Sequence, residues 1–339
     1  MAGTDVRAGR AGIRSGAGGR LRSTDAHTPP AVEVHALSKT YAGGIEAVKG
    51  IDFEVAAGEV FGLLGPNGAG KSTTIGMLTT TIAPTAGAAR LAGHDVSSEP
   101  LLARAVSSVV FQEAVIDRGL SGRANLELHA RLWAVSPREA QPRIAELAEA
   151  VGVTELLERP VGSYSGGQRR RLEIARALVS RPRVLFLDEP TVGLDPRIRH
   201  ELLDVVSGLR DREEMTIVLT THYLEEAQRL CDRVAIMHLG EVVALDSPAS
   251  LLAGLGREIV EFRVGSEPEL AMRQLRELGV ARDDAFAVGA RVTIPLHEQS
   301  AAAAIAALDG TGLDISELTT RTPSVDDIYL RLTGNRIAA

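Results

Sequence analysis

The stretch GPNGAGKST, residues 65–73, has the residue types and spacing that most directly suggest chemistry. Its pattern, Gly-x-x-x-x-Gly-Lys-Ser, places glycines where backbone N–H groups can turn inward around a phosphate. It also supplies a lysine that can reach the β and γ phosphates and a hydroxyl suited to Mg²⁺. The stretch is therefore predicted to be a phosphate-binding loop for a nucleoside triphosphate. The residues assigned to it are Gly65, Pro66, Asn67, Gly68, Ala69, Gly70, Lys71, Ser72 and Thr73.

A pair of acids, Asp188 and Glu189, ends the apolar run Val184–Leu187. Adjacent carboxylates at the end of a strand can divide the work of hydrolysis. One lies near the metal as a ligand through water, and the other polarises the attacking water as a general base. We therefore predict that Asp188 lies near Mg²⁺ and that Glu189 is the general base.

A third motif, Ser165-Gly166-Gly167-Gln168, precedes a helical pattern in which Leu172, Ala175 and Val179 share one face. The helix start has no acid in its first turn, and three arginines follow at 169–171. Free N–H groups and the positive end of the helix dipole make this start a candidate anion site. An ordinary helix cap is the alternative. The sequence does not say whether the phosphate would belong to the same chain or to a partner.

These motifs need a scaffold that brings them together. Val60–Leu64, Val184–Leu187 and Ile217–Leu219 are short apolar runs bounded by turns, which indicates buried parallel strands in an α/β sheet. Alternating apolar residues between 32 and 55 predict antiparallel strands. The pattern at 120–159 is mostly helical, which predicts a helical insert over about 113–165.

After Pro248 the periodicities start afresh and predict a second unit. The expected elements are a strand at 259–264, a helix at 268–278, a hairpin around Gly289, a helix at 301–308, a strand at 313–318 and a last helix after Pro323. This β-α-β-β-α-β order predicts a ferredoxin-like α+β domain. The expected division of the chain is a disordered tail at 1–30, a nucleotide-binding domain at 31–252 and an accessory domain at 253–339.

Composition limits the class of protein. Of the 339 residues 45% are apolar, and the longest fully apolar run, Ala301–Leu308, is far shorter than the roughly 20 residues of a membrane helix. A single cysteine, Cys231, and the lack of a signal-peptide pattern predict a reducing, cytosolic environment. The net charge of −7, with no basic block in the body of the chain, argues against nucleic acid as a partner.

Six segments, in order, resemble those of the ATP-binding subunits of ABC transporters: GPNGAGKST, Gln112 in VVFQE, YSGGQ, VLFLDEP, GLDP and TTH. The resemblance covers about residues 32–252 and implies a P-loop NTPase core with an antiparallel β subdomain and a helical insert. TTHYLEEAQRLCDRVAIMHLGEVVALDSPASL and the closing TPSVDDIYLRLTG look like the daunorubicin/doxorubicin-resistance type, which drives multidrug or antibiotic export. With them the resemblance covers nearly the whole chain apart from the tail.

The resemblance implies roles that the residues alone do not assign. Tyr41 would stack on adenine, as base–aromatic stacking allows. Gln112 would touch the metal, so that the implied Mg²⁺ ligands are Ser72, Gln112 and Asp188, and its loop would report the γ-phosphate to a membrane partner. His222 would orient the γ-phosphate and the attacking water, which places it with Glu189 and Gln112 in catalysis.

The same resemblance implies a second subunit. Ser165, Gly166, Gly167 and Gln168 would complete the ATP site of the opposing subunit, and Asp195 would lie at the interface. In a homodimer the two-fold axis would make both sites competent. Tyr164 stands where leucine is common in this motif, a change that alters no chemistry.

The resulting hypothesis is an ATP-hydrolysing motor subunit at the cytoplasmic face of the cell membrane. It would work as a homodimer with a separate polytopic permease of the ABC-2 type and export a hydrophobic drug, with lipid, polysaccharide or sodium ion as alternative cargo. A soluble ABC ATPase acting on ribosomes or DNA is the second hypothesis, but those families usually carry two ATPase domains or long coiled coils. A ligand-sensing C-terminal domain is the third, although no convergent polar site is evident after Ala249.

Overall fold

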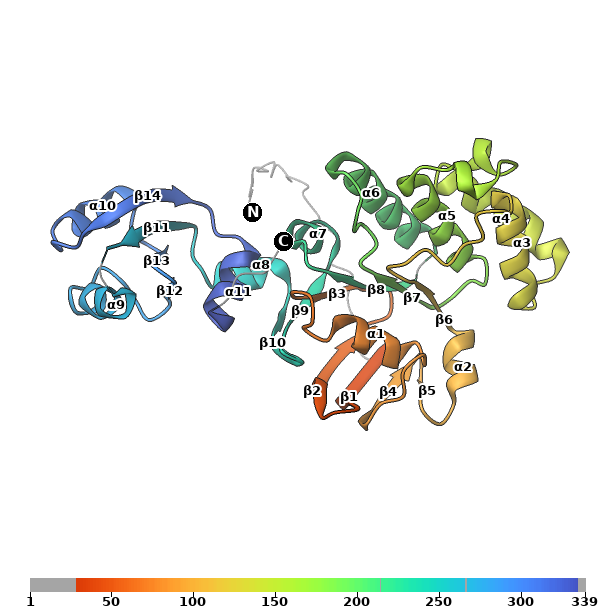
Figure 1. Ribbon diagram of the computed structural model, residues 1–339, viewed down its shortest axis with the longest axis horizontal. Helices are drawn as coiled ribbons and strands as arrows, with labels where there is room; N and C mark the ends of the chain where they lie inside the picture. Colours follow the sequence, from red (N-terminus) through yellow and green to blue (C-terminus); the bar gives the residue numbers. More distant parts are fainter. Residues whose placement is uncertain (1–28, 214, 266, 335–339) are drawn as a thin grey trace, which may run out of the picture.

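The computed structural model describes residues 29–213, 215–265 and 267–334 of the chain (Figure 1). Residues 1–28 of the predicted tail lie outside these described residues. Three sheets organise the described part of the chain, two of them next to each other and the third at one end of the molecule. The predicted fold class, an α/β core with an antiparallel β subdomain, a helical insert and a small α+β unit, is confirmed.

The central sheet has six strands in the order β10-β9-β3-β8-β7-β6. They are β3 (Val60–Leu64), β6 (Ser107–Val110), β7 (Val184–Asp188), β8 (Thr216–Thr221), β9 (Arg233–His238) and β10 (Glu241–Asp246). Neighbours are parallel except β9 and β10, which pair as antiparallel strands. Every residue of β3, β7 and β8 is buried, which explains why two of them read as unbroken apolar runs. Because β8 lies between β3 and β7, the loops that follow these three strands meet at one edge of the sheet.

The antiparallel strands predicted before the phosphate loop form a second sheet, in the order β2-β1-β4-β5. They are β1 (Val32–Tyr41), β2 (Ile45–Val55), β4 (Ala86–Leu91) and β5 (His94–Asp95), and α2 (Pro100–Ala105) follows them. One apolar core joins this sheet to the central one, and it includes Ile75 and Met77 of α1 (Lys71–Leu78). The helix that follows the phosphate loop is thus fixed by packing.

The predicted helical insert is also present. It contains α3 (Gly122–Leu132), α4 (Pro137–Ala150) and two short 3₁₀ turns (Thr154–Leu156 and Val161–Ser163), and α5 (Gly166–Leu178) follows it. Ser121 and Ser136 cap α3 and α4 with their hydroxyls, as the residues before helices commonly do. The remaining helices of this part are α6 (Pro196–Glu213), α7 (Leu224–Leu230) and α8 (Pro248–Ala253). Among the helices of the described residues, none combines the length and apolar character of a membrane span.

The C-terminal unit has the predicted β-α-β-β-α-β order. Its elements are β11 (Glu258–Val264), α9 (Pro268–Glu277), β12 (Phe286–Val288), β13 (Arg291–Leu296), α10 (Ala301–Asp309) and β14 (Ile315–Arg321). The strands pair only as antiparallel neighbours, in the order β12-β13-β11-β14. Val260, Phe262 and Val264 of β11 share a core with residues of α9 and α10. This order is that of a ferredoxin-like unit.

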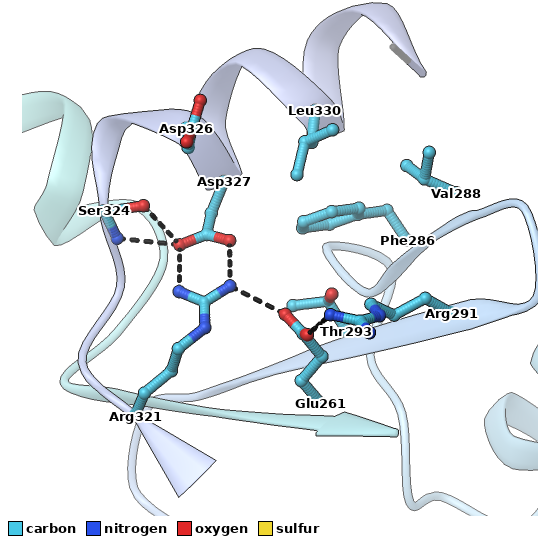
Figure 2. Close-up of a pocket in the computed structure, with 10 residues that line it drawn as sticks. All are labelled: Glu261, Phe286, Val288, Arg291, Thr293, Arg321, Ser324, Asp326, Asp327 and Leu330. Carbon is cyan, nitrogen blue, oxygen red and sulfur yellow. Dashed lines mark hydrogen bonds and ion pairs between the residues drawn. The ribbon is translucent and has the colours of Figure 1, made fainter. Parts of the chain in front are cut away.

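The opposite side of this sheet carries a charged cluster that sequence reasoning did not foresee (Figure 2). Glu261, Arg291, Arg321 and Asp327 line a cavity of about 440 Å³. Arg321 donates to both carboxylate oxygens of Asp327, at 2.8 and 2.7 Å, and to Glu261 at 2.7 Å. These charges pair with one another and so fix the start of α11 (Val325–Thr333) against the sheet.

The last helix, α11, also joins the core of the central sheet. Val325, Ile328 and Tyr329 are buried there, and the Tyr329 hydroxyl lies 2.7 Å from Nδ1 of His238 at the end of β9. The helix therefore belongs to both units by its contacts. The predicted division of the chain at residue 252 stays a prediction.

Replacing Asp327 by asparagine is expected to lower the free energy of unfolding at pH 7 by about 2 kcal/mol, because the change removes the fully buried carboxylate that binds Arg321 through both oxygens and leaves Arg321 with Glu261 alone. Burial alone would raise the pKa of Asp327, but Arg321 and Ser324 hold it below its ordinary value of 3.8. The pair therefore stabilises the fold above that value and is lost as the pH falls below it. Denaturant unfolding measures the loss.

The matched control is Glu317→Gln, which removes a half-exposed carboxylate from the same cluster. Exposed ion pairs contribute little, so this variant should lose no more than about 0.5 kcal/mol. Equal losses in the two variants would contradict the assigned role of Asp327.

Candidate active site

The loop at residues 65–70 turns sharply between β3 and α1 because its glycines permit close backbone approach. A Cβ at Gly65 would lie 2.4 Å from the carbonyl oxygen of Met237, and one at Gly70, where φ is 105°, would lie 2.6 Å from that of Ala47. The residue before α1, which begins at Lys71, is Gly70, and it has no side chain to accept from the first N–H groups of the helix. The helix start thus offers free N–H groups to an anion.

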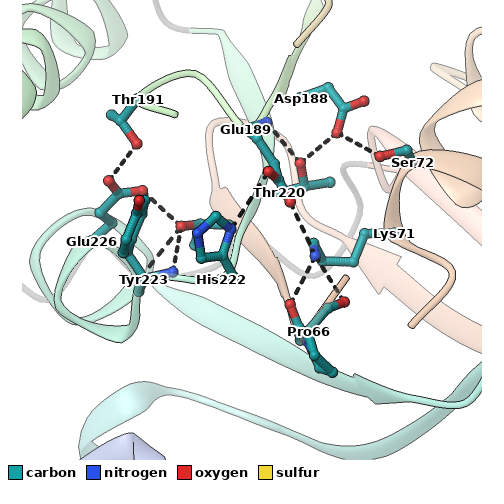
Figure 3. Close-up of polar contacts among 12 residues, drawn as sticks. Pro66, Lys71, Ser72, Asp188, Glu189, Thr191, Thr220, His222, Tyr223 and Glu226 are labelled. Atoms are coloured by element: carbon teal, nitrogen blue, oxygen red, sulfur yellow. Dashed lines mark hydrogen bonds and ion pairs between the residues drawn. The ribbon is translucent and has the colours of Figure 1, made fainter. Parts of the chain in front are cut away.

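Lys71 is only 4% exposed, and its ammonium group lies inside this turn. Its Nζ donates to the carbonyl oxygens of Gly65 at 2.7 Å and Pro66 at 3.1 Å. It also lies 3.1 Å from Oε1 of Glu189, which is 5% exposed. The structure thus brings the lysine of the phosphate loop and the predicted general base into one buried ion pair (Figure 3).

Asp188 lies at the end of β7, and its carboxylate accepts hydrogen bonds from two hydroxyl groups (Figure 3). Ser72 donates to its Oδ1 at 3.2 Å, and Thr220 of β8 donates to the same oxygen at 2.6 Å. The Thr220 hydroxyl in turn accepts from the N–H of Glu189 at 2.8 Å. The start of α1, the end of β7 and the end of β8 are therefore joined through one buried carboxylate.

Glu189 has a φ of 45°, which non-glycine residues rarely adopt. Such a conformation costs about 1 kcal/mol or more and persists where neighbouring contacts enforce it. His222, which follows β8, places its Nδ1 3.5 Å from Oε2 of Glu189. The two predicted catalytic side chains therefore face each other across the strand ends (Figure 3).

Gln112 is not part of this cluster. It follows β6, is exposed and has no hydrogen bond among the described residues. It lines a cavity of about 230 Å³ together with Gly166, Arg170 and Gly193. Tyr41 at the end of β1 lies nearer to the phosphate loop, because its hydroxyl is 3.5 Å from Oγ1 of Thr73. Tyr41 is 40% exposed.

The motif at 165–168 starts α5 with a capping box. Ser165 accepts from the N–H of Gln168 at 3.2 Å, and the side chain of Gln168 accepts from the N–H of Ser165 at 2.9 Å. Gly166 is exposed, while a Cβ at Gly167 would lie 2.4 Å from Cγ2 of Ile198. Asp195 is exposed and accepts from the N–H of Ile198 in α6 at 3.1 Å. Among the described residues, none of these contacts reaches the phosphate loop.

The three arginines after this motif do not form a free basic patch. Arg169 donates to the carbonyl oxygen of Tyr164, Arg171 donates to Glu201 at 2.9 Å, and Arg170 is buried. Tyr164 is buried as leucine would be, but its hydroxyl also donates to the carbonyl oxygen of Leu156. The substitution thus adds a hydrogen bond to the helical insert.

Sequence reasoning missed Thr220, Arg170 and Glu226. Glu226 of α7 is buried, burial raises its pKa, and it accepts from the hydroxyls of Thr191 and Thr221. A signal was present for Thr220, because a threonine in a fully buried strand needs a polar partner. For Arg170 and Glu226 the sequence gives less, because partners such as Pro190 of Arg170 and Thr191 of Glu226 lie 20 and 35 residues away.

Comparison with known proteins decides the family. The family model described as ABC transporter matches residues 48–192. The daunorubicin/doxorubicin resistance ATP-binding protein DrrA of Streptomyces peucetius is 43% identical, over 90% of this chain and 93% of its own length. The Nod factor export ATP-binding protein I of Rhizobium johnstonii is 36% identical, over 91% of this chain and 97% of its own length.

This chain belongs to the ABC transporter ATP-binding proteins. Its similarity to the daunorubicin/doxorubicin-resistance type confirms the resemblance predicted from the motifs. ATP binding and ATP hydrolysis follow as the activity of this ABC ATPase.

Solved structures agree. The cbiO1 subunit of Clostridium perfringens, part of the ABC transporter complex cbiONQ, matches with a TM-score of 0.62 and 26% identity, over 73% of this chain and 95% of that one. A dimeric ATP-binding cassette in a post-hydrolysis state with ADP and Pi matches with a TM-score of 0.58 and 26% identity, over 64% of this chain and 98% of that one.

The site predicts a specific effect of Thr220→Val. The change keeps the shape but leaves the Glu189 N–H without a partner and the Asp188 carboxylate with Ser72 as its remaining hydroxyl donor, so the ATPase rate should fall about 10-fold or more. The matched control is Thr216→Val at the other end of β8, where the buried hydroxyl accepts from the N–H of Gly58. This control should lose stability but keep its ATPase rate. A comparable loss of rate in both variants would show that the effect is not specific to the site.

Proposed function

We propose that this ABC ATPase hydrolyses Mg-ATP with Lys71 on the phosphates, Glu189 as general base and His222 orienting the attacking water. The observation that carries the proposal is the cluster in which the Glu189 carboxylate lies 3.1 Å from the ammonium group of Lys71 and 3.5 Å from Nδ1 of His222. A base must be held close to the reacting water, and a histidine next to it can fix that water and the γ-phosphate.

The donor groups suit Mg²⁺. Ser72 and Asp188 present a hydroxyl and a carboxylate that already touch at 3.2 Å, next to the phosphate loop. No cluster of three or more acidic, histidine or cysteine side chains suited to a metal occurs among the described residues. That fits an ion bound through a few protein groups together with substrate phosphates. When bound, Mg²⁺ would neutralise charge on the phosphates, and the predicted contribution of Gln112 would require its loop to move.

The ion pair between Lys71 and Glu189 has a consequence for the reaction. For Lys71 to reach the phosphates and Glu189 to reach water, their contact at 3.1 Å must open. Phosphate oxygens would compete with the Glu189 carboxylate for the ammonium group. Arrival of the substrate would thus free the base at the position where the attacking water is needed.

A homodimer is proposed to form the complete site. Ser165, Gly166 and Asp195 are exposed and lie apart from their own phosphate loop, which suits contact with the ATP of a second subunit. In such a dimer the free N–H groups at the start of α5 would face an anion. The matching solved cassette described as a dimer supports this arrangement.

A separate membrane permease is the proposed partner, with this chain at the cytoplasmic face of the membrane. Leu101 of α2 and Leu132 of α3 are 74% and 69% exposed and line one cavity of about 350 Å³ together with Trp133. Exposed apolar side chains that gather at one cavity suit a protein partner. The patch lies between α2 and the helical insert.

The proposed cargo is a hydrophobic drug, and the proposed permease is of the ABC-2 type. The names of the relatives support drug resistance first, while the Nod factor relative is named for a different export. Lipid, polysaccharide or sodium ion therefore remain the alternative cargo. A soluble ABC ATPase acting on ribosomes or DNA is the alternative function, and the exposed apolar patch argues against it.

The variant Glu189→Gln should keep ATP binding, lose turnover and accumulate a dimer in the presence of Mg-ATP. The reason is that glutamine keeps the shape of the base but cannot accept the proton of the attacking water. Phosphate release, nucleotide binding and size-exclusion chromatography measure the three results. Hydrolysis at the parent rate would make the assignment of the base wrong.

Pull-down of the tagged protein from native membranes in mild detergent should recover one polytopic protein in near-equal amount. The double variant Leu101→Ser/Leu132→Ser should recover at least about 10-fold less, because it makes the proposed contact polar. Leu270→Ser, a matched change at an exposed leucine of α9, should recover the parent amount. Recovery of the tagged protein with ribosomes or DNA instead would contradict the proposed role in transport, but it would not affect the proposed ATPase chemistry.

A further inference from the structure

Arg170 in the second turn of α5 is 7% exposed, and its guanidinium group makes five hydrogen bonds. An arginine has five N–H donors, and five acceptors surround this one. They are the carbonyl oxygens of Phe111, Asp188, Glu189 and Pro190 and the carboxylate of Glu173. A buried charge with this many directed bonds fixes the relative position of every segment that contributes an acceptor.

Three of these acceptors are consecutive carbonyl groups at the end of β7. The distances to the guanidinium nitrogens are 3.2 Å for Asp188, 3.2 Å for Glu189 and 2.7 Å for Pro190. The middle residue is the one with a φ of 45°. Thr220 holds the N–H side of Glu189, at 2.8 Å, while Arg170 holds its carbonyl side. Between them they account for how the strand end keeps its unusual backbone conformation.

The remaining acceptors lead to the loop of Gln112. Phe111, whose carbonyl accepts from Arg170, directly precedes Gln112. Glu173 accepts from Arg170 at 3.2 Å and from the N–H of Val115 at 2.9 Å, and it is itself buried. One guanidinium and its paired carboxylate therefore hold both sides of the loop that contains Gln112.

We propose that Arg170 is a positioning residue for ATP hydrolysis, which fixes Glu189 at the end of β7 and ties that position to the Gln112 loop and to α5. The proposal rests on the proposed role of Glu189 as general base. Because the start of α5 carries Ser165 and Gly166, a displacement of either α5 or the Gln112 loop is transmitted to Glu189 through one side chain. Lysine cannot replace it, since an ammonium group has three donors at a single point.

The first test compares Arg170→Lys with Arg171→Lys in the full chain. Arg171 is a matched control, because the same change one residue later affects a partly exposed pair with Glu201 and a long hydrogen bond, 3.5 Å, to the carbonyl oxygen of Val151, neither of which involves Glu189 or the Gln112 loop. Arg170→Lys should lower kcat about 10- to 100-fold with KM for ATP within about 3-fold of the parent, because a base displaced by about 1 Å loses rate rather than substrate binding. Arg171→Lys should keep the parent kcat. Parent kcat in Arg170→Lys, or equal losses in both variants, would overturn the proposal.

The second test asks whether Arg170 acts through Glu189. Single-turnover hydrolysis is measured for Arg170→Lys, Glu189→Gln and the double variant, with thermal melting of each as the control for folding. If the two residues act as a unit, the double variant should be no slower than Glu189→Gln alone. Losses that multiply would overturn the positioning role. Parent-rate hydrolysis by Glu189→Gln alone would instead overturn the general-base assignment, which distinguishes the two failures.

Discussion

The buried ion pair between Lys71 and Glu189 is the constraint on which the rest of the site depends. An isolated charge inside a protein is strongly unfavourable, so two side chains that are 4% and 5% exposed must meet at close range. The lysine comes from the turn after β3 and the glutamate from the end of β7, and these strands are not neighbours. The strand between them is β8, so a residue at the end of β8 must supply a polar group next to the ion pair. Thr220 supplies that group, and its buried hydroxyl is therefore a consequence of the strand order.

Unusual backbone geometry follows from the same constraint. To bring Lys71 inward, the loop after β3 approaches the chain at Met237 and Ala47 so closely that only glycine fits at positions 65 and 70. On the opposite side, Glu189 adopts a positive φ that carries its carboxylate toward the lysine. Both distortions are local costs, and both are held by packing and hydrogen bonds from elements far away in the sequence.

The sequence allowed prediction of the elements and the chemistry, but not of the partners. Buried runs such as Val184–Leu187 are readable because a strand covered on both faces has no polar side. The alternation along β11 is readable because its two faces differ, with Phe262 in the core and Glu261 in the charged cluster. Strand order is not written in such patterns, so the contact between Thr220 and Asp188 could not be predicted. For the same reason three consecutive arginines suggested a basic helix start, whereas the four carbonyl acceptors of the buried Arg170 lie 18 to 59 residues away in the sequence.

The C-terminal unit is connected to the phosphate loop through a short chain of contacts. Tyr329 of α11 touches His238 at the end of β9, and the turn that follows places the N–H of Gly240 3.1 Å from the carbonyl oxygen of Ala69 in the loop. The carbonyl oxygen of Gly240 accepts from Lys49 of β2, so this turn also joins the two sheets. Since Asp327 anchors the same helix to the C-terminal sheet, a rotation of that sheet would act on the turn that supports the loop. The last helix of the chain is therefore part of the support of the phosphate loop, although it lies more than two hundred residues away in the sequence.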